Sequence, residues 1–214
     1  MRSTNHGVAG GGGMTDVRTL ATEAVGAEVQ TKPLVPLIEA DQAPLLARPY
    51  FAGGDPGPMV AVLAQVPELL EVTMPFLGAV LGPSSIPTRT KEIVILRTSA
   101  RAGCRYCVDS HTVVARDAGL SVTEVRALRG EIDDTTVFAD PADQAVIGWC
   151  DALVGTGSVT SEAKSHLQAA FGDHEVVELT LLATTTLLLN RFCTSLDLPS
   201  SPEVLDRLAA EGLR

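Results

Sequence analysis

The chain has 214 residues, of which 45% are hydrophobic and only 4% aromatic, and its formal net charge is −10. A chain of this length can bury a substantial core, which Ala, Val, Leu and Ile must build here, as in closely packed helices. The negative charge and the lack of a basic run exclude a surface that would neutralise a nucleic-acid backbone. We therefore expect a globular helical protein that does not bind nucleic acid.

The N-terminal part is predicted to differ from the rest of the chain. Residues 1–14 contain a glycine run and are expected to form a flexible tail. They lack the apolar segment of a secretory signal, so the expected location is the cytoplasm. Residues 15–58 hold several prolines and a Gly/Pro-rich stretch at 53–58, which predict an arm of short helices.

From residue 59 to 214 the apolar spacing predicts one all-α helical domain, with almost no strand-like alternation. The expected helices span 58–65, 67–81, 88–102, 104–118, 121–129, 140–155, 160–171 and 173–196. The longest apolar stretch, 176–189, is interrupted by Glu178 and falls short of the roughly 20 residues that cross a bilayer. It predicts a buried helix and no membrane contact.

Local signals explain several of these boundaries. Gly119 stands where a left-handed helix cap is wanted, and Ser121 with Glu124 has the capping-box pattern that begins a helix. Pro141 follows Asp140, which predicts the first turn of another helix.

Two of the four cysteines form a Cys104-x-x-Cys107 pair, which in a reducing compartment indicates redox or metal chemistry. Helical spacing places both cysteines and His111 on the packed face of the 104–118 helix. The opposite, polar face is expected to carry Arg105, Asp109, Ser110, Arg116 and Asp117. Gly103 indicates that the helix begins here, so both the helix dipole and the nearby imidazole would lower a thiol pKa.

Glu92 is the second candidate for acid-base chemistry, because it shares the inward face of the 88–102 helix with apolar residues. The polar side of that helix is expected to carry Lys91, Arg97, Thr98 and Arg101. An inward carboxylate needs a partner or a raised pKa. Antiparallel pairing of the two adjacent helices would bring Glu92 toward His111, while pairing with a structural arginine is the alternative.

Glu92, Cys104-Arg105-Tyr106-Cys107 and His111 together resemble the signature of the AhpD-like alkylhydroperoxidases within the carboxymuconolactone decarboxylase superfamily. The motif-bearing part covers about 87–128, and the helices over 59–196 are compatible with it. The resemblance implies a homo-oligomeric AhpD-like helical bundle, with the motif on helices 88–118. It also implies a peroxidase that needs no bound cofactor.

By that resemblance Cys107 attacks the peroxide, Cys104 resolves the sulfenic acid to a disulfide, and Glu92 and His111 relay the proton. Better-studied members have a second histidine where this chain has Tyr106. Helix-end electrostatics alone favours Cys104 as the nucleophile. The spacing to His111 and the resemblance favour Cys107, which we adopt.

The remaining polar and aromatic candidates are expected to have structural roles. Cys150, Cys193 and Trp149 are interpreted as core, and His166 and His174 as solvated. Tyr106 is predicted to turn away from the thiols while staying near them. Asn190 and Arg191 are expected at a helix end or a subunit contact. A zinc site built on the pair is disfavoured, since no second Cys/His pair has metal spacing.

The sequence thus predicts a thiol-dependent peroxidase that acts on a hydroperoxide. Its reductant is expected to be a dithiol or a thioredoxin-like protein, and the resemblance adds a lipoyl-bearing protein. Two alternatives stay open: a non-peroxidatic thiol-disulfide oxidoreductase or redox sensor, and a decarboxylase-like, lactone-processing enzyme in which the cysteines are incidental.

Overall fold

The computed structural model describes residues 32–133 and 136–214. These ranges contain helices and connecting segments with no strand, so the all-α prediction is confirmed. The tail over 1–14 and the first part of the predicted arm lie outside the described residues. The helices are a short 3-10 turn Ala40–Gln42, α1 Arg48–Phe51, α2 Pro58–Leu63, α3 Pro67–Leu81, α4 Thr88–Ala102, α5 Arg105–Asp117, α6 Val122–Leu128, α7 Pro141–Val154, α8 Ser161–Ala170, α9 Asp173–Ser195 and α10 Pro202–Ala210.

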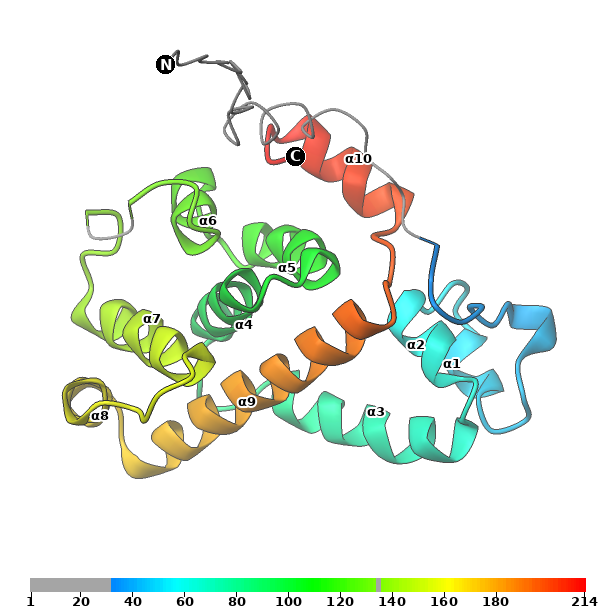
Figure 1. Ribbon diagram of the computed structural model, residues 1–214, viewed down its shortest axis with the longest axis horizontal. Coiled ribbons are helices and arrows are strands. Elements are labelled where there is room, and N and C mark those ends of the chain that lie inside the picture. The colour runs from blue at the N-terminus through cyan, green and yellow to red at the C-terminus, as the bar shows by residue number, and fades with distance from the viewer. Residues whose placement is uncertain (1–31, 134–135) are drawn as a thin grey trace, which may run out of the picture. The chain divides into compact units, whose positions relative to one another are not determined.

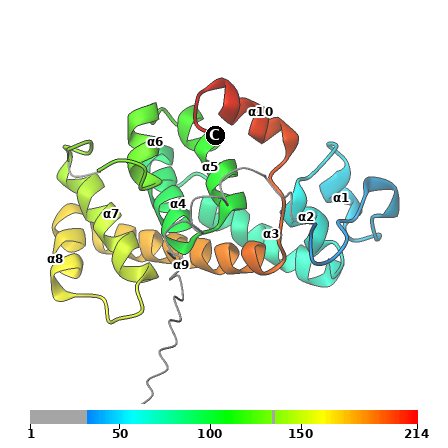
Figure 2. The same cartoon turned by 45° about the horizontal axis from the view of Figure 1, so that its top comes forward.

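Helix α4 is the central element, and it packs against α5, α7 and α9 (Figures 1 and 2). The main core forms around it from Ile, Val, Leu and Ala side chains, with Trp149 as a packing residue. Among the fully buried side chains are Ile93, Leu96, Leu120 and Leu179. This composition agrees with the prediction of a core poor in aromatics.

The predicted polar side of α4 is wrong for three of its four residues, because this central helix is enclosed by its neighbours, and only Arg101 is exposed as predicted. Lys91, Arg97 and Thr98 are all buried. The Lys91 Nζ donates to the Gly82 carbonyl at 2.6 Å, and Arg97 pairs with both carboxylate oxygens of Asp151 at 2.7 Å. A buried charge is tolerated only with such partners.

The predicted helix ends agree with the structure to within a residue or two. Gly119 adopts the left-handed conformation with φ 93°, and Ser121 and Glu124 form a reciprocal capping box. The Asp140 side chain accepts from the Ala142 N–H at 2.9 Å at the start of α7.

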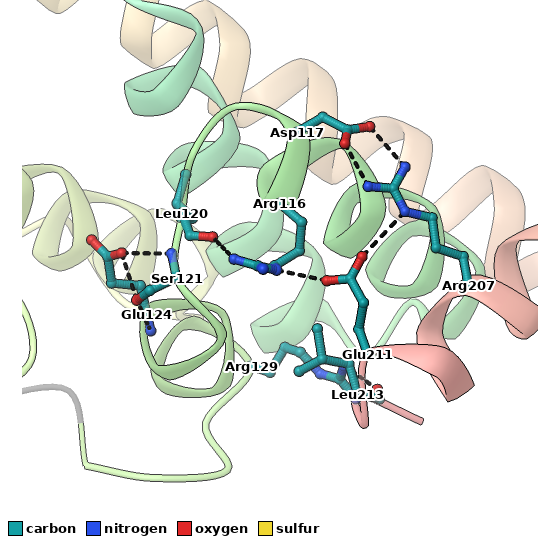
Figure 3. Close-up of polar contacts among 9 residues, drawn as sticks. All are labelled: Arg116, Asp117, Leu120, Ser121, Glu124, Arg129, Arg207, Glu211 and Leu213. Carbon is teal, nitrogen blue, oxygen red and sulfur yellow. Dashed lines mark hydrogen bonds and ion pairs between the residues drawn. The ribbon is translucent and has the colours of Figure 1, made fainter.

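Helix α10 was not among the predicted helices, and it covers the face of α5 that was expected to meet solvent. Its Leu208 is buried in the main core. Arg207 pairs with Asp117, and Glu211 pairs with Arg116 at 2.7 Å (Figure 3). Asp109 is buried too, accepting from Ser200 Oγ at 2.6 Å in the segment that leads into α10. Tertiary packing thus overrides the amphipathic pattern of α5.

Helix α9 has almost the predicted bounds, and it extends beyond the apolar stretch 176–189 at both ends. Among the described helices it alone has the length and composition to cross a membrane, a test that the core helix of a globular protein also passes. It packs along α3, α4, α5 and α7 and buries the polar residues Thr185, Thr186 and Asn190. These contacts are those of a core helix.

The part of the arm that the structure describes folds over the C-terminal end of α9. The Leu34 N–H donates to the Leu196 carbonyl at 3.0 Å, and the Ile38 N–H donates to the Ala61 carbonyl at 3.1 Å. Val35 and Leu37 pack, together with Val62 of α2, on the cluster that contains Cys104 and Cys107. The arm therefore helps to separate the cysteine pair from water.

Candidate active site

The cysteine pair lies at the junction between α4 and α5. Gly103 ends α4 in the left-handed conformation with φ 70°, and the Cys104 N–H donates to the Ser99 carbonyl at 3.1 Å, which closes the last turn of α4. Cys104 is the N-cap of α5, and its sulfur accepts from the Cys107 N–H at 3.4 Å. The prediction that a helix begins at the pair is confirmed.

The two sulfur atoms are 2.6 Å apart, and both cysteines are reduced and buried. Since a disulfide bond is about 2.05 Å long, closing one requires a relative movement of only about 0.5 Å. The pair is thus arranged for reversible dithiol-disulfide chemistry.

Of the two coupled thiols, Cys104 is the more acidic. Hydrogen bonds from the Cys107 and Cys193 thiols lower the pKa of Cys104 to about 3. The neighbouring Cys104 raises the pKa of Cys107 to about 12. A thiolate at the N-terminus of a helix also gains from the helix dipole. This distribution agrees with the helix-end argument rather than with the resemblance.

Glu92 and His111 meet as predicted from the helix pairing. The His111 Nδ1 lies 3.0 Å from the Glu92 Oε2. The Glu92 side chain is 7% exposed and that of His111 is 28% exposed, so a buried carboxylate orients an imidazole that reaches water. The carboxylate fixes one ring nitrogen, and the other is left to exchange a proton.

Helix α9 supplies two further site residues that the sequence interpretation placed elsewhere. Cys193 was interpreted as core, but it belongs to the same buried cluster as Cys104 and Cys107. Asn190, expected at a helix end or subunit contact, is 1% exposed and donates from Nδ2 to Ser99 Oγ at 2.9 Å. Its amide also lowers the pKa of Cys107 through a hydrogen bond.

A sequence signal for these two residues exists, but it is weak. Asn190 and Cys193 are three residues apart and therefore share one helix face. Thr186 and Leu182, which precede them at intervals of four, are buried on that face. A polar residue on a buried face needs a partner. Only the packing of α9 against α5 identifies the cysteine pair as its neighbour.

Tyr106 packs on the cysteine cluster together with Met59 and Leu198, rather than turning away from it. Burial is the main cause that raises the pKa of its hydroxyl to about 12, so the phenol is neutral. The side chain is therefore an apolar wall of the site with a polar tip near the Met59 backbone.

The other candidates are buried or exposed as predicted. Cys150 is fully buried in the main core, where burial raises its pKa to about 12. His166 and His174 are exposed. A cavity of about 480 Å³ between α7 and α8 is lined by His166 and by none of the four predicted site residues. Within residues 32–133 and 136–214, no group of three or more His, Cys, Asp or Glu side chains is arranged to hold a metal ion.

The sequence model of the carboxymuconolactone decarboxylase family matches residues 67–149, a range that runs from α3 into α7 and contains Glu92, Cys104, Cys107 and His111. Residues 67–149 therefore form a domain of the carboxymuconolactone decarboxylase family. The predicted family is thereby confirmed.

Curated relatives align with about half of the chain. An uncharacterised protein of Mycobacterium tuberculosis is 37% identical over 108 residues, which are 49% of this chain and 37% of the relative. The protein YdfG of Bacillus subtilis is 27% identical over 103 residues, which are 46% of this chain and 67% of that protein. The chain thus spans little more than a third of the length of the M. tuberculosis relative it matches.

Solved structures share the fold more completely. A protein of unknown function from Agrobacterium tumefaciens, described as an AhpD antioxidant defence protein, is 24% identical with a TM-score of 0.61, over 65% of this chain and 95% of that one. The debrominase Bmp8, in a cysteine-to-alanine variant bound to 2,3,4-tribromopyrrole, is 18% identical with a TM-score of 0.70, over 86% and 99%. A peroxidase-related protein of Ralstonia eutropha is 18% identical with a TM-score of 0.68, over 81% and 96%. At these identities the likeness shows the AhpD-like helical fold alone.

Proposed function

We propose that this AhpD-like domain is a thiol-dependent peroxidase that reduces hydroperoxides through Cys104 and Cys107. The observation that carries the proposal is the 3.0 Å contact between Glu92 of α4 and His111 of α5, because α5 begins at the two sulfurs, which are 2.6 Å apart. A carboxylate, an imidazole and a dithiol are the groups that peroxide reduction needs. No bound cofactor takes part in the proposed cycle.

The proposed cycle begins with a proton shift inside the pair. The resting thiolate is Cys104, and transfer of the Cys107 proton to it across the 2.6 Å contact gives a minor form in which Cys107 is the thiolate that reacts. Cys107 is 6% exposed and Cys104 only 1%, and Cys107 lies one turn from His111. These two facts favour Cys107 as the sulfur that attacks.

The Cys107 thiolate then attacks the peroxide ROOH, forming Cys107–SOH and an alkoxide leaving group. His111, oriented by Glu92, gives a proton to that leaving group, so the alcohol ROH departs. The Cys104 thiol condenses with Cys107–SOH to form the disulfide and water. An external dithiol, or a lipoyl-bearing or thioredoxin-like protein, restores both thiols by exchange.

We infer a homo-oligomer from an apolar surface on α3 and α9, which we call the α3–α9 face. Its members are exposed and recur at helical intervals: Leu69, Val72, Phe76, Val177, Leu181 and Leu188. The two helices pack against each other, so the two exposed apolar stripes lie on adjacent helices. An apolar surface of this kind is typical of subunit contacts. The expected location remains the cytoplasm, where a dithiol is kept reduced.

The second candidate is a thiol oxidoreductase that does not act on peroxide. It is favoured by the likeness to a debrominase whose complex with 2,3,4-tribromopyrrole carries a cysteine-to-alanine replacement. In the third candidate, a lactone-processing enzyme of the decarboxylase branch, the cysteines would be incidental. Both are distinguished from the peroxidase by the same experiment.

The test is stopped-flow oxidation of the reduced protein by hydrogen peroxide and by an organic hydroperoxide, with mass analysis of each cysteine. The peroxidase proposal expects fast formation of a Cys104–Cys107 disulfide and its loss in Cys107→Ser. Oxidation no faster than that of free dithiothreitol would favour the second candidate. Turnover of a lactone acid by Cys104→Ser/Cys107→Ser would favour the third. Cys150→Ser is the matched control, since that thiol lies in the main core.

A further inference from the structure

Cys193 differs from the other cysteine outside the motif in what surrounds it. Cys150 is enclosed by the main core, and its thiol points to the Val94 carbonyl at 3.8 Å. Cys193 instead packs with Cys104 and Cys107, and its thiol is close enough to both of theirs to interact with them. Three thiols therefore share one buried cluster.

The local structure of α9 holds Cys193 at this position. Helix α9 ends two residues later at Ser195, and Asp197 takes the left-handed conformation with φ 51°. This lets the Leu198 N–H donate to the Cys193 carbonyl at 3.1 Å, while the Leu198 side chain packs on the cysteine cluster. Cys193 thus lies in the last turn of α9, which the Leu198 hydrogen bond closes. It packs there against Cys104 and Cys107.

We propose that Cys193 is a third redox-active thiol of the site and a second resolving cysteine, which closes an inter-helix disulfide with Cys107 when Cys104 is unavailable. The proposal deepens the proposed function and rests on it for the peroxide-driven step. In that step Cys107–SOH and the Cys193 thiol form the Cys107–Cys193 disulfide and release water. The bond joins α5 to α9, and an external dithiol reopens it by exchange.

The same contact provides a route from the first disulfide. The Cys193 sulfur attacks one sulfur of the Cys104–Cys107 bond as its proton passes to the sulfur that leaves, so that one cysteine of the pair joins Cys193 and the other becomes a thiol. No oxidant is consumed in this exchange. The oxidised protein is therefore a mixture of two disulfide forms. In one the disulfide joins Cys104 to Cys107 within one helical turn, and in the other it joins one of them to Cys193 on α9.

The chain allows these bonds to be read directly from tryptic peptides. Cys104, Cys107, Cys193 and Cys150 fall in four separate peptides: 102–105, 106–116, 192–207 and 130–164. The experiment treats reduced Cys104→Ser with an organic hydroperoxide or with diamide, blocks the remaining thiols and maps the linked peptides. Diamide oxidises two thiols to a disulfide as it is reduced to the hydrazine, so it requires no peroxidase activity.

We expect the link between 106–116 and 192–207 with both oxidants. It should disappear in Cys104→Ser/Cys193→Ser, where Cys107 advances to the sulfinic acid under peroxide, and persist in Cys104→Ser/Cys150→Ser. If diamide forms the Cys107–Cys193 link but hydroperoxide does not react, the peroxidase proposal is overturned. The proposal that Cys193 is a redox-active thiol is then still supported. Cys107 oxidation without a link under either oxidant would overturn the role of Cys193.

A second measurement avoids dependence on a single variant. The wild-type protein is equilibrated in a glutathione redox buffer, and its free thiols are blocked before digestion. We expect part of the 192–207 peptide to be linked to 102–105 or to 106–116. Its recovery entirely as the blocked thiol, while the Cys104–Cys107 link is present, would overturn the proposal.

Discussion

The His111 Nδ1 lies 3.0 Å from the Glu92 Oε2, so an imidazole on α5 is oriented by a carboxylate that α4 carries into the interior. The carboxylate is nearly inaccessible, whereas the imidazole edge reaches water. A pair arranged in this way can deliver a proton to a leaving group without exposing the thiols.

Replacing Glu92 by Gln should therefore slow oxidation of the thiols by hydroperoxide. General acid-base catalysis is worth about 100-fold or more, and the amide would no longer stabilise a protonated imidazole. The measurement is the second-order rate constant by stopped flow at pH 7. Glu162→Gln, on the exposed surface of α8, is the matched control. An unchanged rate in Glu92→Gln would remove this residue from the mechanism.

The reduced protein should retain a thiolate in mildly acidic solution. The pKa of Cys104 is lowered to about 3 by hydrogen bonds from Cys107 and Cys193, whereas its ordinary value is 9.0. Thiolate absorbance at about 240 nm should persist at about pH 6 and disappear in Cys104→Ser, because deprotonation follows the folded-state pKa. Cys150→Ser should leave the titration unchanged. Absorbance that rises only above pH 7 would contradict the assignment.

The same thiolate should make stability depend on pH. Between pH 3 and 9 the unfolded chain holds a proton on Cys104 that the folded chain has released. Unfolding then takes up a proton, so the contribution of Cys104 is fully present above pH 9 and is lost as the pH falls toward 3. Urea unfolding of the reduced wild type and of Cys104→Ser should give free energies that diverge as the pH rises over this interval. Parallel curves would contradict the prediction.

Asn190→Ala should raise the pKa of the Cys107 thiol, because the amide that stabilises its thiolate is removed. We expect a slower reaction with peroxide at pH 7 that recovers at higher pH, and a loss of about 1 kcal/mol in unfolding free energy because Ser99 loses its donor. Thr186→Ala, four residues earlier on the same buried face, is the control for packing alone. A stability loss without a shift of the pH–rate profile would reduce Asn190 to a structural role.

Asp151→Ala should destabilise the fold more than Asp117→Ala. Asp151 accepts two hydrogen bonds of 2.7 Å from the buried Arg97, and breaking such a pair costs about 3 kcal/mol. Asp117 pairs with Arg207 on the surface, where solvent screens the charges (Figure 3). Urea denaturation of both variants measures the difference. Equal losses would show that the two ion pairs contribute alike.

Val72→Asp should dissociate the proposed oligomer. The side chain is 66% exposed in the centre of the α3 stripe of the α3–α9 face, so a charge there would be buried without a partner in a subunit contact. Sedimentation velocity should report a smaller species than the wild type forms. Ile132→Asp, an exposed apolar residue outside that face, is the control. A wild type that sediments as a monomer at all concentrations would refute the oligomer.

The sequence by itself determined the helical class and most helix boundaries, and it predicted that Glu92 would approach His111 while leaving a structural arginine open as the alternative partner. These features depend on short-range rules: apolar periodicity, the caps at Ser121 and Asp140, and the near absence of a loop between α4 and α5. The same rules misplaced Lys91 and Arg97, because periodicity assigns polar residues to a solvent face even on a helix that others enclose.

Only the tertiary structure decided which distant residues join the thiols. Cys193 and Asn190 follow the pair by more than eighty residues, and α9 brings them to it by packing on α4 and α5. Helix α10 likewise covers α5 through Leu208 and Arg207. Local spacing carries no information about which helix faces meet, since that choice follows from the burial of apolar area over the whole core. The motif could therefore be recognised in the sequence, but the residues of α9 that surround the cysteine pair could not be predicted from it.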